Sequence, residues 1–232
     1  MSISLALYAA IGLLMVDSII ELAFITSMVS WLHNTASGTF VVNDNGSTFD
    51  LAWKPMHMLL DQGHTANGAA GTAFVLVGLV GIFVLWLRSR RNYYSSKFSI
   101  FLYNTWIVFC ILAFMLTIGA LGYVFAVTNA HKGQTIDVAV AKTLRNQAKY
   151  PLDTWTPQNW FAAVLKLDLA DASVRSDISH HLRIMRGWQY NLIPMFIIQF
   201  FTTILIVLDA MIRRKARPNS KQYSSVEQKA TP

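Results

Sequence analysis

The stretch SLALYAAIGLLMVDSIIELAFITSMVSW, residues 4–31, decides the fold, because it is long enough to cross a lipid bilayer and yet contains two acids. A transmembrane helix needs about 20 largely apolar residues. Asp17 and Glu21 stand one helical turn apart near the middle of this stretch, and therefore on one helix face. A carboxylate at the centre of a span costs about 2.5–3.5 kcal/mol, so we expect this face to contact protein or water rather than lipid.

Three further apolar blocks follow, and the chain is only 13% charged, whereas soluble domains carry about 25% charged residues. We therefore predict an all-α membrane protein: a four-helix transmembrane bundle with an extracytoplasmic helical loop between spans 3 and 4. The bundle forms one domain, residues 1–212, and a disordered basic cytoplasmic tail occupies residues 213–232. The predicted spans cover about residues 4–32, 68–88, 98–128 and 189–212.

Basic residues cluster directly after the second and fourth spans, and they account for much of the net charge of +7. These flanks are Arg88, Arg90, Arg91 and Lys97 in the first case, and Arg213, Arg214, Lys215 and Arg217 in the second. The positive-inside rule then places both termini in the cytoplasm and the two long loops on the other side. The positive charge is thus explained by the membrane flanks, and we expect the protein to contact the lipid bilayer and not nucleic acid. Asn45-Gly46-Ser47, an N-glycosylation acceptor sequence, lies in the first of these loops.

The loops themselves carry helix-start patterns. Residues 34–50 are polar and predict a loop or short hairpin, after which Lys54-Pro55 predicts a helix that runs into span 2. Thr156-Pro157-Gln158 predicts another helix start, with threonine as the cap. Residues 174–185 have helical spacing and lead through Gly187 into span 4, where we expect Pro194 in the first turn.

Asp17 and Glu21 are the candidate catalytic residues. Two ionised carboxylates one turn apart in a low dielectric repel, so we expect at least one to be protonated. By depth, Gln199 is expected to meet Asp17, and Thr72 to meet Glu21. Two interpretations stay open: the acids are polar groups satisfied by hydroxyls, amides and water, or they form a proton or cation relay or an acid in a substrate pocket.

The histidines all fall in or beside the two long loops under this topology. His57, Asp61 and His64 would share one face of the helix predicted before span 2. With His180 or His181 they would offer nitrogen and oxygen ligands for zinc, iron or copper. No compact metal motif accompanies them, and hydrogen-bonding or interfacial histidines are the alternative.

Three sequence blocks resemble a group of four-span membrane proteins of filamentous fungi. They are Ala66–Phe74 (ANGAAGTAF), Trp155–Phe161 (WTPQNWF) and Met185–Pro194 (MRGWQYNLIP). The group has no assigned activity, so the resemblance carries over no catalytic residue or cofactor. Some small four-span proteins of this general kind are encoded in fungal secondary-metabolite clusters, and the resemblance implies such a setting here. Claudin-like proteins and tetraspanins fit poorly, because Cys110 is the chain's single cysteine.

These patterns leave three functions open. An accessory or scaffold membrane protein needs only packing faces, such as the small residues of spans 2 and 3, which favour close packing within the bundle, with a membrane-protein partner or with a second copy. A small membrane enzyme, oxygenase-like or cyclase-like, would act on lipophilic metabolites through the acids or the histidines. A transporter subunit is the least favoured, because no internal repeat is visible.

Overall fold

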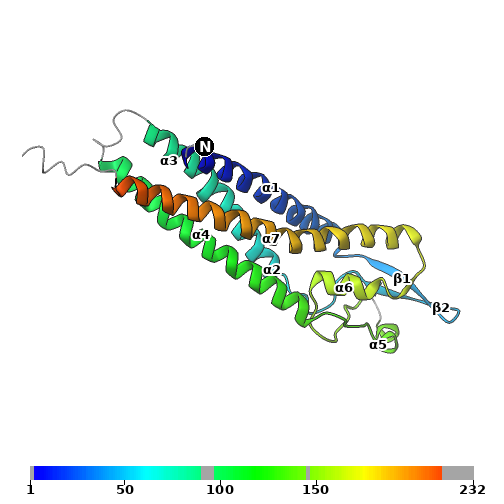
Figure 1. The fold of residues 1–232 in the computed structure, drawn as a ribbon. Helices are drawn as coiled ribbons and strands as arrows, with labels where there is room; N and C mark the ends of the chain where they lie inside the picture. The colour runs from blue at the N-terminus through cyan, green and yellow to red at the C-terminus, as the bar shows by residue number, and fades with distance from the viewer. Residues whose placement is uncertain (1–2, 90–96, 145–146, 216–232) are drawn as a thin grey trace, which may run out of the picture.

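The computed structural model describes residues 3–89, 97–144 and 147–215. It shows an elongated bundle of long helices, and the two long loops together form a cap at one end of the bundle (Figure 1). The first, third and fourth spans are α1 (Ile3–Thr35), α4 (Lys97–Ala130) and α7 (Ala172–Lys215). The second span is built from α2 (Asp61–Thr72), a π-helical segment η1 (Ala73–Leu79) and α3 (Val80–Ser89). Among the described residues these four helical rods are long and apolar enough to cross a membrane, which confirms the predicted number.

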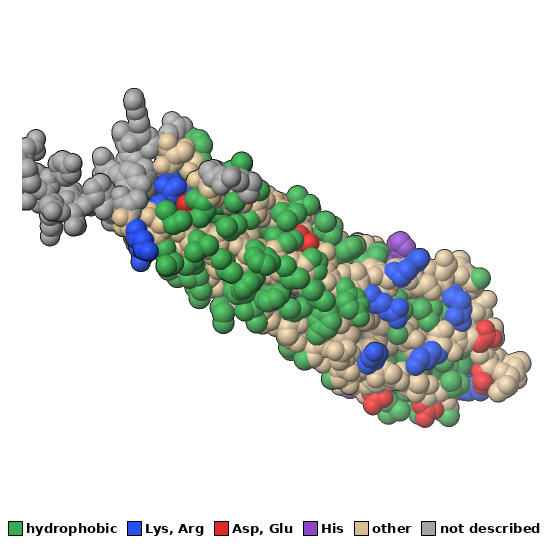
Figure 2. Space-filling view, in the orientation of Figure 1, with side chains coloured by type: hydrophobic (Ala, Val, Ile, Leu, Met, Phe, Trp, Pro, Cys, Tyr) green, Lys and Arg blue, Asp and Glu red, His purple; other side chains and the backbone are tan. Residues whose placement is uncertain are grey.

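The surface of the bundle supports the same conclusion. Figure 2 shows hydrophobic side chains covering its middle, whereas most charged side chains lie toward the two ends. Large apolar side chains such as Leu13, Leu112 and Phe201 are more than half exposed along this belt. A continuous apolar belt of this kind marks a membrane surface. By length and composition, then, this is a multi-pass membrane protein.

The first long loop is a β-hairpin, one of the two forms predicted for it. Strands β1 (Thr39–Asp44) and β2 (Ser47–Ala52) pair antiparallel, and the turn residues Asn45 and Gly46 have φ angles of 48° and 83°. Asn-Gly suits such a turn because both residues tolerate positive φ. Strand β3 (Asp168–Leu169), from the second long loop, joins β1 on its other edge, with Val42 opposite Leu169. This small sheet makes the cap partly β, which the all-α prediction missed.

The prediction that a helix begins at Lys54-Pro55 is wrong, because α2 begins only at Asp61. The backbone before it pairs with the second loop instead. Met56 N donates to Tyr150 O at 2.8 Å, and Leu59 N donates to Trp155 O at 2.8 Å. Trp155 N in turn donates to His57 O at 2.9 Å. These long-range bonds use donors that a helix would have needed for itself, so the segment stays extended.

The centre of the cap is a group of buried aromatic rings around α6 (Pro157–Val164), and the short helix α5 (Val138–Thr143) packs against β2. Thr156 caps α6 by accepting a hydrogen bond from Asn159 N, and Pro157 occupies its first turn, as predicted. Trp155 and Trp160 are fully buried and meet edge to face, with ring centroids 5.2 Å apart. Trp160 Nε1 also donates to Trp53 O at 2.8 Å, which fastens the second loop to the first.

α7 is a single helix that passes from the cap through the whole bundle. It begins after Asp171, whose carboxylate accepts a hydrogen bond from Ser173 N at 2.7 Å; hydrogen bonds from Ser173 lower the pKa of Asp171. The helix continues past Gly187, so Pro194 lies in its interior and not in a first turn, contrary to prediction. It ends at Lys215, so the first residues of the predicted tail are helical, and residues 216–232 lie outside the described part.

Small residues let span 2 approach its neighbours closely. A Cβ added at Gly81 would lie 2.7 Å from the Trp106 ring, and the indole of Trp106 is fixed because Nε1 donates to Leu76 O at 3.0 Å. Leu76 belongs to η1, where the change from α-helical to π-helical bonding alters which carbonyls the helix itself satisfies. Gly81 and Trp106 therefore fix how α3 packs on α4.

We predict that Gly81→Ala lowers the thermal midpoint of unfolding in detergent, because overpacking a rigid contact costs about 1–3 kcal/mol and outweighs the helix propensity gained. Gly71→Ala is the matched control, since a Cβ there meets nothing within 4 Å. That control should unfold at or above the wild-type temperature. Equal midpoints for the two variants would contradict the close packing of α3 on α4.

Candidate functional site

Asp17, Ser18 and Glu21 form a polar cluster on the buried face of α1, against α7. Glu21 and Ser18 are fully buried, and Asp17 is 8% exposed. Within the described residues, both carboxylate oxygens of Glu21, Oδ2 of Asp17 and the Ser18 hydroxyl have no hydrogen-bond partner. The acids thus face protein, as the sequence predicted, but their polar atoms are incompletely satisfied there.

The partners of these acids differ from those predicted. Gln199 lies elsewhere along α7, where its Oε1 accepts a hydrogen bond from Thr117 of α4 at 2.6 Å. Asn191 is the amide near the acids: its Nδ2 lies 3.5 Å from Asp17 O, and its side chain also approaches Glu21. The described residues show no hydrogen bond between Thr72 and Glu21. The contacts of Trp31 with Asp177 and of Asn191 with Asp17 set the register of α7 against α1, and this register does not bring Gln199 to Asp17.

Within the described part of the chain, Trp188 of α7 carries a further unsatisfied polar group on this side of the bundle. Asn191 lies beside Asp17. A Cβ added at Gly187 would lie 3.5 Å from the ring of Phe24, so these two residues are also close. These two contacts bracket Trp188 at the level of Glu21. Its buried indole N–H has no partner among the described residues. Several unsatisfied donors and acceptors therefore lie at one depth in the α1–α7 interface.

The proposed metal ligands are not brought together. His57 is in the extended segment before α2, so it does not share a helix face with Asp61 and His64. His180 and His181 lie near the cap end of α7. The described residues contain no group of three or more His, Cys, Asp or Glu side chains placed to hold a metal ion. The premise of one shared helix face was wrong because the helix begins at Asp61.

His181 instead takes part in a set of contacts that joins α1 to α7. Its ring stacks on Trp31, with centroids 4.2 Å apart and an interplanar angle of 9°. Asp177 accepts a hydrogen bond from Trp31 Nε1 at 2.8 Å and lies 3.1 Å from His181 Nδ1. The indole, the carboxylate and the imidazole form one contact where both helices enter the cap.

A cavity of about 580 Å³ opens between the cap end of α1 and the start of α2. Its apolar wall includes Ile25, Met28 and Leu32 of α1 and Trp188 of α7. Two of the six histidines, His33 and His64, line the cavity, whereas His57, His180 and His181 do not. This volume lies in the range of small-molecule sites, roughly 300–1,000 Å³. Sequence reasoning did not find the cavity, because it is formed by segments from three separate parts of the chain.

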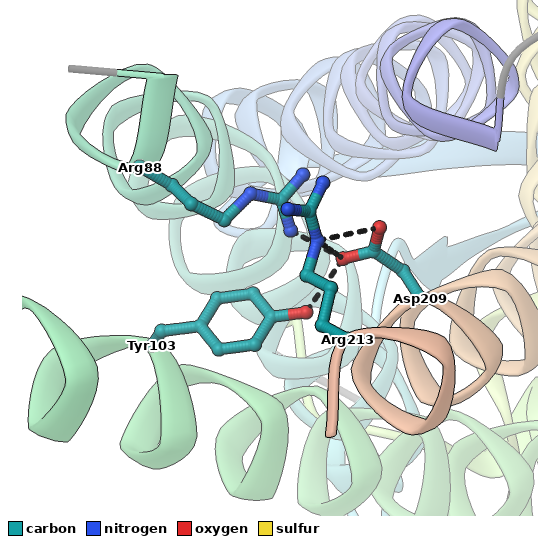
Figure 3. Close-up of polar contacts among 4 residues, drawn as sticks. All are labelled: Arg88, Tyr103, Asp209 and Arg213. Atoms are coloured by element: carbon teal, nitrogen blue, oxygen red, sulfur yellow. Dashed lines mark hydrogen bonds and ion pairs between the residues drawn. The ribbon is translucent and has the colours of Figure 1, made fainter. Parts of the chain in front are cut away.

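The Asp209 cluster occupies the opposite end of the bundle (Figure 3). Asp209 is 1% exposed and pairs with Arg213 one turn later, at 3.1 Å from Nε to Oδ1. It also binds the buried guanidinium of Arg88 from α3 and accepts a hydrogen bond from the Tyr103 hydroxyl of α4 at 2.7 Å. Arg88 lies over the Tyr103 ring, 5.2 Å from its centroid. Sequence analysis assigned Arg88 to the basic flank and missed this junction of three helices.

Comparison with known proteins supplies no further guidance to the site. No protein-family model, curated protein or solved structure matches this chain. The resemblance to four-span fungal proteins stays a prediction.

We predict that Asp209→Ala destabilises the bundle strongly, by about 3–5 kcal/mol, because it leaves Arg88 buried without its counter-charge. Replacing both partners, as Arg88→Met with Asp209→Leu, should recover much of that loss. Thermal unfolding of the purified protein in detergent measures both effects.

Arg213→Ala is the control for this prediction, because the Arg213 side chain is one-third exposed and such pairs contribute about 0–1 kcal/mol. Equal losses for Asp209→Ala and Arg213→Ala would show that the buried pair with Arg88 is not the main contact.

Proposed function

We propose that this protein is an integral membrane accessory or scaffold protein that acts without catalysis. The observation that supports this function is the separation of the chemically reactive groups. The acids lie inside the α1–α7 interface, whereas the proposed histidine ligands lie apart from them and from one another. General acid–base catalysis needs each such group within about 2.6–3.2 Å, or one water molecule, of the substrate proton that it transfers.

The architecture favours an accessory role for a second reason. The two long loops are joined to each other by backbone hydrogen bonds and buried rings, and α7 carries this cap directly on the bundle. A rigid, largely polar cap on an apolar bundle is a surface suited to a partner protein or a second copy. We propose that it acts in this way beside other membrane proteins, in fungal secondary metabolism if the resemblance holds.

A small membrane enzyme acting on lipophilic metabolites is the second candidate. It is favoured by Glu21, which is fully buried beside Asn191 and whose carboxylate oxygens are incompletely satisfied within the described residues. Buried ionisable groups inside membranes are commonly functional, and an unsatisfied acid is available to a substrate or a proton. Glu21 therefore decides between the two proposals.

Deleting the gene, profiling metabolites and complementing with variants tests both proposals. For an accessory protein, Glu21→Gln and Asp17→Asn should restore the wild-type profile, because each amide keeps the shape of the acid and removes the cost of burying charge. Glu21→Leu should instead lower the amount of protein in the membrane, by leaving neighbouring polar groups unsatisfied at about 1–3 kcal/mol each. If Glu21→Gln reaches normal levels in the membrane but the metabolite profile stays that of the deletion strain, the enzyme proposal is favoured.

The orientation with both termini in the cytoplasm is also a proposal, supported by Arg213, Arg214 and Lys215 at the end opposite the cap. Asn45 is exposed at the hairpin turn, and the cap would then lie in the lumen or outside the cell. We predict that Asn45 is glycosylated when the protein enters a secretory membrane. Glycosidase treatment should increase its gel mobility, and Asn45→Gln should reproduce that mobility. A wild-type band that glycosidase does not shift would count against this orientation.

A further inference from the structure

The cavity between α1 and α2 has an uneven distribution of charge. Its polar lining includes Lys54, His33 and His64, and it contains no aspartate or glutamate. Lys54 precedes α2 on the extended segment of the cap, and within the described residues it makes no ion pair. Asp50 and Asp61, the nearest acids on either side of Lys54 along the chain, are exposed and are not part of the lining. The cavity thus combines an unpaired cation with two imidazoles that can donate hydrogen bonds.

The opposite wall of the cavity is apolar. Ile25, Met28 and Leu32 are each at most 6% exposed, and Trp188 is 4% exposed. Along α1 these side chains run from the cap end toward the middle of the span, so this wall extends to the depth of the apolar belt. The cavity therefore has a polar side that suits the head group of an amphiphile and an apolar wall that suits its tail.

We propose that this cavity binds an acidic lipid taken from the leaflet next to the cap, with its carboxylate or phosphate near Lys54, His33 and His64 and its tail along Ile25, Met28 and Trp188. The positive charge of the lining favours an acidic head group over a neutral one, because a neutral lipid would leave Lys54 unpaired. This site lies beyond the accessory role proposed above and does not depend on it. It requires no chemistry at Asp17 or Glu21.

Gly63 offers a direct way to block the site. It lines the cavity from α2, and a Cβ placed there meets nothing within 4 Å, so a larger side chain would enter open space. Gly68, also on α2, has the same freedom but lies outside the lining. Gly63→Leu and Gly68→Leu thus form a matched pair, in which only the first fills the cavity.

The test uses the purified full chain in phosphatidylcholine nanodiscs and two photoactivatable probes, a fatty acid and the fatty alcohol of equal length, each with a diazirine in its tail. Wild-type protein should be labelled about tenfold more by the acid at equal concentration, because a charge-assisted hydrogen bond adds this much affinity. Peptide mapping should place the label near Ile25–Leu32 and Trp188. Gly63→Leu should lose this labelling, and Gly68→Leu should retain it.

Lys54→Met provides an independent measurement if Gly63→Leu does not fold. It should label equally with the acid and the alcohol, because the cavity keeps its apolar wall and loses its cation. Equal labelling of the wild type by both probes would overturn the proposal. So would acid labelling spread over the lipid-facing residues of the bundle, which would show contact with bulk lipid only.

Discussion

The structure depends on how four apolar helices accommodate the few polar groups between them. In a hydrocarbon environment each unsatisfied polar group costs several kcal/mol, so these groups fix which helices meet and at what depth. Asp209 joins α3, α4 and α7, and Gln199 joins α7 to α4 through Thr117. Trp106 does the same for α4 and η1. Each of these contacts orders the bundle because the alternative is an exposed polar atom in lipid.

The cap depends on a second set of contacts that reach across long stretches of chain. Trp155 exchanges backbone hydrogen bonds with the segment before α2, and Trp160 binds the carbonyl of Trp53. α7 then connects this cap to the bundle, and Trp31 of α1 joins it through Asp177 and His181. The cap and the bundle therefore meet at α1 and α7, the two helices whose interface contains the buried acids, and also at α4, where Thr128 O accepts a hydrogen bond from Asn159. The lipid cavity lies beside that interface, at the boundary between polar cap and apolar bundle.

The spans, the i to i+4 pair of Asp209 with Arg213 and the start of α6 could be predicted because each follows from local pattern: apolar length, helical spacing or a Thr-Pro cap. The features that prediction missed depend on partners far away in sequence. The segment before α2 is extended because its donors bind residues 150–155, and Arg88 is buried because Asp209 lies opposite it. Gln199 does not meet Asp17 because contacts far apart in sequence, such as Trp31 with Asp177, set the register of α7 against α1. Nothing in the local sequence around Gly63 or His64 indicates a cavity.

We propose that the four apolar helices cross the membrane and place the cap on the side opposite the cytoplasm. Replacing Cys110, the chain's single and buried cysteine, by serine gives a background for site-specific labelling. Asp50→Cys then reports the exposed hairpin, and Lys215→Cys reports the other end of the bundle. In sealed microsomes with the cytoplasmic face outward, an impermeant maleimide should label Lys215→Cys at once and Asp50→Cys only after detergent is added. Labelling of both sites without detergent, or of the hairpin alone, would contradict the account.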